Sequence, residues 1–407
     1  MKKFKRIISL SIVTLVLLIY GCNQDGEPGL FEPEPEGSTP VISNVIPENS
    51  ALAGVTEVTI NGSNFSSNPD NNFVYFGTAK ANVLQASPNE LIVRAPVLIK
   101  DNIEIKIAVH EAENFSNTVA YNLLEAVGEY YPFKEFEKPY GLTTDALGNI
   151  YVSLVSANVG QGIMKISPEK EIINWAPKGG ETFFHDIKYN SDNKIYAVRN
   201  VRAVFVVEEN NPGATFAVVP NGNFLITLDF DSNGNLWTSG RGGNIFSIKP
   251  DQTVNSFSIN YDVRALRVFD GHLYVSGRND SEEAIYRFEI QSAESLGPEE
   301  KYFDLSGNYG LNTINIQAIT FAQDGDLYLG SDQDNAIIIV HPDKTFEDLY
   351  PGLLKKNVYA MAWGTDENLY YSKESIQSFP GAERLDTVQT IIKVNMQKLG
   401  APYYGRD

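Results

Sequence analysis

Short runs of alternating apolar and polar residues extend over most of the chain, separated by turn residues. Alternation over four to eight residues is the pattern of a half-buried β-strand. Between residues 40 and 125 such runs recur about every ten residues, as in TEVTINGSNF, ELIVRAP and IEIKIAVH. Strands at this spacing, with Gly, Pro and Asn between them, predict a β-sandwich.

The residues of this first segment resemble the IPT/TIG domain, which has an immunoglobulin-like fold. The matching positions are Pro40, Ile42, Pro47, Gly54, Thr56, Gly62, Asn64, Phe65, Val74, Phe76, Gly77, Ala81, Val83, Leu91, Val93 and Pro96. The resemblance implies a spacer or docking module, with direct ligand contact as the alternative. The Gly and Asn positions are explained by turns that need a positive φ.

From residue 126 to 407, a unit of about 44 residues repeats six times. Each unit has a hydrophobic strand, a turn rich in Asp, Asn and Gly, a strand centred on an aromatic residue, and a third strand ending in a polar turn. The central aromatic residues are Tyr151, Tyr196, Trp237, Tyr274, Tyr328 and Tyr370. Four short strands at this period predict a propeller blade. The expected fold is therefore all-β: an immunoglobulin-like β-sandwich followed by a six-bladed β-propeller.

A propeller blade leaves an apolar face that only its neighbours can cover, so the ring must close. The last repeat lacks an outer strand after residues 391–396, and we expect the segment near Glu129–Phe136 to supply it. Trp237 and Trp363 are expected to pack between blades. The repeat resembles that of NHL-repeat propellers, most closely in its first unit, at Gly141, Asp145, Gly148, Asn149, Tyr151 and Val152.

The N-terminal residues follow a different pattern. Four basic residues precede an apolar run from Ile7 to Tyr20, which has the length of a signal-peptide core and is short for a membrane span. Gly21 and Cys22 close the run. The segment resembles a bacterial lipoprotein signal, with Ile19 and Tyr20 departing from the residues usual before the cysteine.

This resemblance implies that residues 1–21 are removed and that Cys22, the only cysteine of the chain, carries the lipid anchor. An ordinary signal peptide is the alternative. The remaining residues up to 39 include five acidic residues, three Pro and three Gly, a composition that predicts an extended tether. Acidic residues at this place resemble the export signal of Bacteroidetes surface lipoproteins, which implies an outer-membrane lipoprotein exposed at the cell surface.

Charge and composition narrow the possible partners. The 407 residues include 32 Lys and Arg against 51 Asp and Glu, a net charge of −19, which argues against nucleic acid as a ligand. A single cysteine excludes an internal disulfide framework and a Cys-rich zinc site. The four His residues form no HExxH motif. We therefore expect no cofactor and assign no metal ligand.

Propeller geometry indicates where a ligand would bind. The loop before each inner strand lies on the same face as the turn between the second and third strands. The aligned positions before the inner strands are Tyr140, His185, Ile226, Arg264, Gln317 and Tyr359. The facing turns add Arg199, Asn200, Arg241, Arg278, Asn279, Asp280, Asp332 and Lys373, and the connection 305–315 adds Tyr309 and Asn312. From these, the predicted ligand-binding residues are Tyr140, His185, Arg241, Arg264, Arg278, Tyr309, Gln317, Asp332 and Tyr359.

These residue types suit a polysaccharide or oligosaccharide. Aromatic faces fit the C–H faces of sugars, and Arg, Asn, Gln and Asp can each satisfy two neighbouring hydroxyls. The bland alternative is that the polar groups only hydrate the channel mouth. The layout resembles the surface glycan-binding lipoproteins of Bacteroidetes polysaccharide-uptake systems, which implies an outer-membrane transporter complex as partner.

Two other functions stay open. One is a protein-interaction or adhesion module, because NHL-type propellers often dock proteins on this face. The other is a metal-dependent enzyme resembling the propeller lactonases and lyases. The aligned channel positions hold one His and no carboxylate, and no GxSxG motif occurs, so no catalytic residue is assigned.

The predicted lipid anchor can be tested directly. We expect Cys22→Ser to abolish incorporation of an alkyne-labelled fatty acid and to move the protein out of the membrane fraction, because no second cysteine can replace the acylated thiol. Asn23→Ala, beside it, is the control and should label like the wild type. Labelling of the Cys22→Ser protein at the wild-type level would contradict the assignment.

Overall fold

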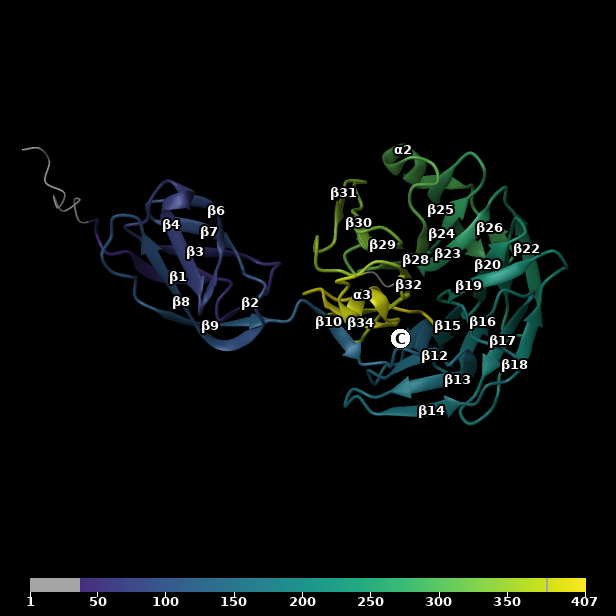
Figure 1. Ribbon diagram of the computed structural model, residues 1–407. Coiled ribbons are helices and arrows are strands. Elements are labelled where there is room, and N and C mark those ends of the chain that lie inside the picture. Colours follow the sequence, from purple (N-terminus) through teal and green to yellow (C-terminus); the bar gives the residue numbers. More distant parts are fainter. Residues whose placement is uncertain (1–36, 378–379) are drawn as a thin grey trace, which may run out of the picture. The chain divides into compact units, whose positions relative to one another are not determined.

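The computed structural model describes residues 37–377 and 380–407, so the predicted signal, Cys22 and most of the tether lie outside the described residues. The chain forms two compact units, which divide between Leu124 and Glu125 (Figure 1). Over the described ranges, no helix is both long and apolar enough to cross a membrane.

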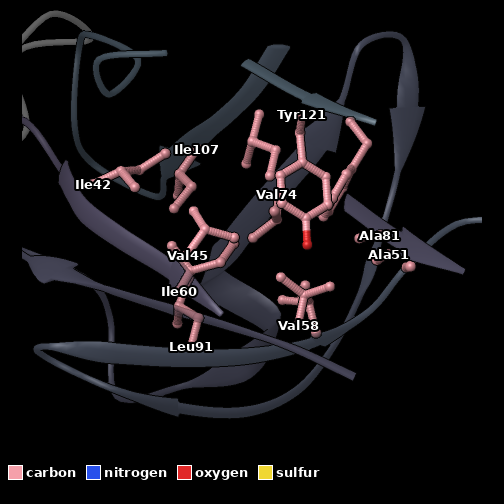
Figure 2. Close-up of a cluster of buried hydrophobic side chains, with 14 of the residues drawn as sticks. Ile42, Val45, Ala51, Val58, Ile60, Val74, Ala81, Leu91, Ile107 and Tyr121 are labelled. Carbon is pink, nitrogen blue, oxygen red and sulfur yellow. The ribbon is translucent and has the colours of Figure 1, made fainter. Parts of the chain in front are cut away.

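The first unit is a β-sandwich of two sheets, as predicted. One sheet has the order β1 (Val41–Ile46), β3 (Glu57–Ser63), β7 (Glu90–Arg94), β6 (Asn82–Ser87). The other has the order β2 (Ser50–Leu52), β9 (Val119–Leu124), β8 (Lys100–Val109), β4 (Asn72–Phe76), β5 (Ala79–Lys80), and η1 (Pro69–Asn71) precedes β4. Alternate residues of both sheets, among them Val58, Leu91 and Ile107, are buried between them (Figure 2).

One glycine of this unit has a different role from the one predicted. Asn64 has a φ of 62°, as expected for a turn, but Gly62 is not among the residues with positive φ. A Cβ added at Gly62 would lie 2.0 Å from the carbonyl oxygen of Val41 and 2.5 Å from the Phe65 ring. Gly62 is therefore needed because β1 and Phe65 approach the backbone closely, and not for its conformational freedom.

The second unit is a propeller, and six sheets form its blades within the described residues. Blade 1 contains β11 (Glu137–Thr144), β12 (Ile150–Ser156), β13 (Val159–Ile166) and β14 (Ile172–Ala176). Blade 2 contains β15 (Asp186–Tyr189), β16 (Ile195–Val198), β17 (Ala203–Val207) and β18 (Ala214–Val218). Blade 3 contains β19 (Phe224–Phe230), β20 (Leu236–Arg241), β21 (Asn244–Ile248) and β22 (Val254–Ser258).

Blade 4 has a divided outer edge, where β26 and β27 both pair with β25. Its strands are β23 (Asp262–Phe269), β24 (His272–Arg278), β25 (Glu283–Ser292), β26 (Ser295–Leu296) and β27 (Glu300–Asp304), followed by α2 (Leu305–Tyr309). Blade 5 contains β28 (Ile316–Phe321), β29 (Leu327–Ser331), β30 (Ile337–Val340) and β31 (Phe346–Asp348). Blade 6 contains β32 (Val358–Trp363), β33 (Asn368–Lys373), α3 (Arg384–Thr387) and β34 (Thr390–Asn395).

The outer strand of blade 6 comes from the start of the unit, which confirms the predicted closure. β10 (Val127–Tyr131) pairs antiparallel with β34, and it begins two residues before the predicted segment. The Arg384 guanidinium stabilises the pairing of β10 with β34. It donates to both carboxylate oxygens of Glu129, at 2.7 and 2.8 Å, and to the carbonyl oxygen of Phe133, at 2.7 Å.

The hydrophobic core of the propeller lies between its blades. Six clusters of buried apolar side chains in the described part of the chain each join two neighbouring blades, and the cluster between blades 6 and 1 completes the circle. Trp237 lies in the cluster of blades 3 and 4, and Trp363 in that of blades 5 and 6. Both indole rings are fully buried, which confirms their predicted packing between blades.

The C-terminal segment 399–407 packs across one end of the central channel and contacts every blade. The Tyr403 hydroxyl accepts from the backbone N–H of Trp363, and Arg406 donates to the hydroxyl of Thr144 in blade 1. Backbone bonds tie the segment to blades 2 and 5, Arg267 bonds it to blade 4, and Gly405 lies against Phe230 of blade 3. These contacts place the C-terminus near the middle of the propeller (Figure 1), and the segment covers this end of the channel.

A buried ion pair connects this segment to the inner strands. Arg267 of β23 lies 2.6 Å from the Asp229 carboxylate of β19, and both side chains are at most 2% exposed. Asp229 also accepts from the backbone N–H of Val268, so it bridges the two inner strands. The Arg267 guanidinium donates to the carbonyl oxygen of Pro402 and lies 4.0 Å from the centre of the Tyr403 ring.

We predict that Arg267→Ala lowers the free energy of unfolding of the propeller by about 3–5 kcal/mol, because it leaves the Asp229 carboxylate buried and unpaired. The three tryptophans of the chain, Trp175, Trp237 and Trp363, all lie in the propeller, so their fluorescence during urea unfolding reports this unit. Lys249→Ala, which removes the exposed pair with Glu294, is the matched control and should leave the midpoint unchanged. Equal midpoints for Arg267→Ala and wild type would contradict the account.

Candidate functional site

The aligned positions predicted from the sequence coincide with β-bulges at the start of the inner strands. In blade 4, Val263 pairs with Gly277 and Ala265 with Ser276, so Arg264 has no partner across the ladder. The same shift leaves Ile226, Gln317 and Tyr359 unpaired in blades 3, 5 and 6, and a wider shift in blade 1 includes Tyr140. A bulge turns its extra side chain away from the sheet.

Blade 2 reaches the same position without a bulge. His185 directly precedes β15, and its backbone N–H donates to the carbonyl oxygen of Val198 in the second strand at 2.8 Å. The six inner strands thus each present one side chain at the same end of the channel.

Glycines in the second strands make room for these bulges. Gly240 pairs with Leu225 beside the bulge of blade 3, and a Cβ there would lie 1.9 Å from the carbonyl oxygen of Phe224. Gly277 has the same place in blade 4, where a Cβ would lie 2.6 Å from the Tyr261 ring. In blades 3 and 4, these glycines therefore allow the start of the inner strand to approach the second strand closely.

Five of the six aligned residues, all except Tyr140, line a cavity of about 390 Å³ at the open end of the channel. Its lining residues are His185, Asn200, Ile226, Arg241, Arg264, Gln317 and Tyr359. Deeper in the channel the free volume falls to about 40 Å³. Since segment 399–407 covers the far end, the cavity is a blind pocket and not a passage.

Aromatic rings form one wall beside this cavity. The Tyr359 hydroxyl lies 2.6 Å from Nδ1 of His185, and the Tyr140 ring meets the Tyr359 ring edge-on at 5.3 Å. Tyr140 is stacked on Phe183, with ring centroids 3.9 Å apart. Phe183 was not predicted as a site residue. The sequence signal that could have identified it is the adjacent pair Phe183–Phe184, of which only Phe184 is buried in the core.

Burial keeps the two hydrogen-bonded groups of this wall neutral. Desolvation lowers the pKa of His185 below its ordinary 6.5, with Asp186 acting against this shift and Arg241 adding to it. Desolvation also raises the pKa of Tyr359 well above 10, and the negative charge of Glu374 adds to this shift. At neutral pH the bond therefore joins an uncharged imidazole to an uncharged phenol.

A second cavity, of about 470 Å³, shares Arg264 with the first and extends over blades 3 and 4. Its lining residues include Asn260, Asp262, Arg264, Arg278, Asn279, Asp280 and Asn312. Arg278 is held by Glu283, at 2.8 Å, and donates to the side-chain oxygen of Asn312. The connection before blade 5 thus contributes Asn312 to this face.

Three of the predicted site residues line neither cavity: Tyr140, whose ring contacts that of Tyr359, and Tyr309 and Asp332, which lie apart. The Tyr309 ring packs 5.7 Å from that of Phe346 and lines a separate cavity of about 260 Å³ with Gln333 and Asn335. The Asp332 carboxylate accepts from the backbone N–H of Asn315 at 3.1 Å and from the Gln333 side chain. The structure therefore brings together Tyr140, His185, Arg241, Arg264, Gln317 and Tyr359, with Arg278 in the adjoining cavity.

The Asp-rich turns of the repeat hold hairpins in place. The Asp231 carboxylate accepts from the side chain of Asn235 and from Nε1 of Trp237, both at 2.9 Å, and Asp145 bonds Asn149 and Tyr151 in the same way. No group of three or more His, Cys, Asp or Glu side chains within residues 37–377 and 380–407 is placed to hold a metal ion.

Comparison with known proteins agrees with this architecture. Residues 40–122 match the family model described as the IPT/TIG domain. This segment is an IPT/TIG domain. No curated protein matches the chain in sequence.

Solved structures resemble the chain over most of its length. They include a structural genomics protein of unknown function from Bacteroides thetaiotaomicron VPI-5482, with 13% identity, a TM-score of 0.50, and coverage of 89% of this chain and 99% of that one. An auxiliary nutrient binding protein from the same organism has 14% identity, a TM-score of 0.47 and coverage of 90% and 99%. A virginiamycin B lyase from Staphylococcus aureus has 15% identity, a TM-score of 0.46 and coverage of 60% and 80%. The likeness to the first structure concerns the fold alone, and the other two, with TM-scores below 0.5, carry no argument.

We predict that two histidines titrate on opposite sides of pH 6.5 in the folded protein. His185 should titrate below that value because burial opposes its charge. His341 should titrate above it because the Asp326 carboxylate accepts a hydrogen bond from its ring. Ring resonances followed by NMR against pH, assigned with His185→Gln and His341→Gln, measure both values. A His185 resonance with an ordinary midpoint would contradict the burial of the site.

Proposed function

We propose that the protein is a lipid-anchored cell-surface protein that binds carbohydrate at the open end of the propeller channel. The observation that supports this proposal is one wall of the channel mouth. There, aromatic rings lie beside polar groups that can each make two hydrogen bonds. Tyr140 and Tyr359 supply ring faces and edges, and Gln317, Asn200 and Arg264 supply donors and acceptors beside them.

The chemistry of sugars matches this wall. A pyranose ring has apolar C–H faces and a rim of hydroxyls, so it binds where a flat ring adjoins groups that make two hydrogen bonds each. The cavity of about 390 Å³ lies within the range of small-ligand sites, roughly 300–1,000 Å³. Because the pocket is closed below and open above, it suits one or two sugar units of a longer chain.

The rest of the chain supports a place at the cell surface in the same proposal. The expected lipid on Cys22 and the acidic tether would hold the protein at the outer membrane, with the IPT/TIG domain as a spacer before the propeller. A binding protein of this kind serves polysaccharide uptake, and the proposed partner is an outer-membrane transporter complex.

We predict that Tyr140→Ala weakens the affinity for the bound glycan roughly 2- to 12-fold, because an aromatic contact contributes about 0.5–1.5 kcal/mol. The glycan is first identified on an array of plant, algal and host polysaccharides with the mature chain, and its affinity is then measured by calorimetry. Phe136→Ala, which removes an exposed ring that contacts neither Tyr359 nor Phe183, is the control and should bind like the wild type.

Two outcomes would contradict the proposal in different ways. If the protein binds a glycan but Tyr140→Ala and Tyr359→Phe both bind it like the wild type, the site lies elsewhere on the molecule. If no glycan on the array binds, while a protein from the same cell surface does, the propeller is an interaction module.

A further inference from the structure

The walls of the 390 Å³ cavity carry a charge opposite to that of the protein. The chain has a net charge of −19, yet the lining residues of this cavity include two arginines, Arg241 and Arg264, and no carboxylate. A concentration of one charge sign in a concave, partly desolvated site attracts the opposite charge. The cavity is therefore suited to an anion, although the surface as a whole repels one.

Arg264 is free to meet such an anion. It is exposed, it lines both cavities of the open end, and among the described residues it makes neither an ion pair nor a side-chain hydrogen bond. The bulge that leaves it unpaired in the ladder also directs it away from the blade. Its five N–H groups are available to a ligand.

The Arg241 side chain is held in place by its neighbours, but no carboxylate balances its charge. One of its terminal nitrogens donates to the Asn200 side chain at 3.0 Å, and its guanidinium lies 5.0 Å from the centre of the Phe224 ring. Neither contact supplies a negative charge. Arg278, in contrast, is paired with Glu283 at 2.8 Å, so its charge is already balanced.

Three carboxylates line the cavities at the open end or lie below them, and none is paired with Arg241 or Arg264. Asp186, below the cavity, is 2.6 Å from Lys188 and accepts from the hydroxyl of Thr227 and the backbone N–H of Leu228. Asp262, in the adjoining cavity, accepts from the backbone N–H of Gly242 at 3.2 Å. Asp280 also lines the adjoining cavity, and none of these three carboxylates forms an ion pair with Arg241 or Arg264 in the described structure.

We propose that the glycan bound at this mouth is acidic, with an anionic group of the sugar held between Arg241 and Arg264. This inference rests on the proposed function. The guanidinium fork matches the two oxygens of a carboxylate, which favours a uronic acid, and a sulfate ester presents the same chemistry. The aromatic wall at Tyr140 and Tyr359 then supports the ring that carries the acid.

The test compares sugars that differ only in charge. The mature chain is titrated by calorimetry with two acidic sugars and their neutral partners, oligogalacturonate with its methyl ester and glucuronoxylan with unsubstituted xylan. Chondroitin sulfate and unsulfated chondroitin, which both carry uronate carboxylates, form a third pair that differs in the sulfate alone. We expect the acidic member of each of the first two pairs to bind at least about tenfold tighter than its neutral partner, because hydrogen bonds between charged groups are stronger than those between neutral groups. A sulfated ligand preferred over the uronates would identify a sulfate as the anion.

Substitutions in the two arginines complete the test. Arg264→Gln and Arg241→Gln should each weaken the acidic ligand roughly tenfold and leave a neutral glycan nearly unaffected. The control is Arg202→Gln, an exposed arginine that lines neither cavity and should bind like the wild type. Equal binding of neutral and acidic sugars, with both variants unaffected, would overturn this inference and leave the proposed function intact. Absence of binding to any sugar would overturn both.

Discussion

The structure depends on the closure of the propeller ring. Each blade has an apolar face that only the next blade covers, so the six inter-blade clusters are complete only when blade 6 meets blade 1. The join is made by β10 on β34, two strands more than 250 residues apart in the chain. Segment 399–407 adds a second closure, because it contacts all six blades at one end of the channel. Without these two elements, the propeller would expose to water the apolar surface of its end blades and the charge of Arg267, which is now buried.

This closure explains why the binding site lies where it does. Burial between blades constrains most residues of each repeat, from the central aromatic to the glycine beside the bulge. The aligned residue is unpaired in the ladder in five of the six blades, and Tyr359 also packs against the cluster between blades 6 and 1. In chain order, the residues at this aligned position are Tyr, His, Ile, Arg, Gln and Tyr. Such variety is expected of a binding site and not of a hydrophobic core. The fold thus provides one adaptable position per blade around a blind pocket.

Much of this arrangement could be predicted from the sequence. The six aromatic positions indicated the blades, the missing outer strand indicated the closure, and alignment of the repeats placed Tyr140, Arg264 and Tyr359 at equivalent positions before the bulges were known. These features recur, and recurrence is visible without a structure. The Gly240-type residues also recur, in WTSG and YVSG, and could have identified the bulges.

Features that occur once could not be predicted in this way. Lys188 and Arg267 are charged residues of the inner strands, and each is paired with a carboxylate, Asp186 and Asp229 respectively. The C-terminal segment has no repeat pattern, so its place in the channel follows only from the contacts of Tyr403 and Arg406. Tyr309 was assigned to the ligand face from loop length alone, and loop length does not determine which way a side chain packs.

The most direct test of this account is a crystal structure of the mature chain with the oligosaccharide that binds it most tightly. The account predicts electron density for a sugar in the cavity lined by Arg241, Arg264 and Tyr359, with an acidic group within hydrogen-bond distance of both guanidinium groups. Density on the IPT/TIG domain or on the outer edge of a blade, with the channel mouth empty, would contradict it.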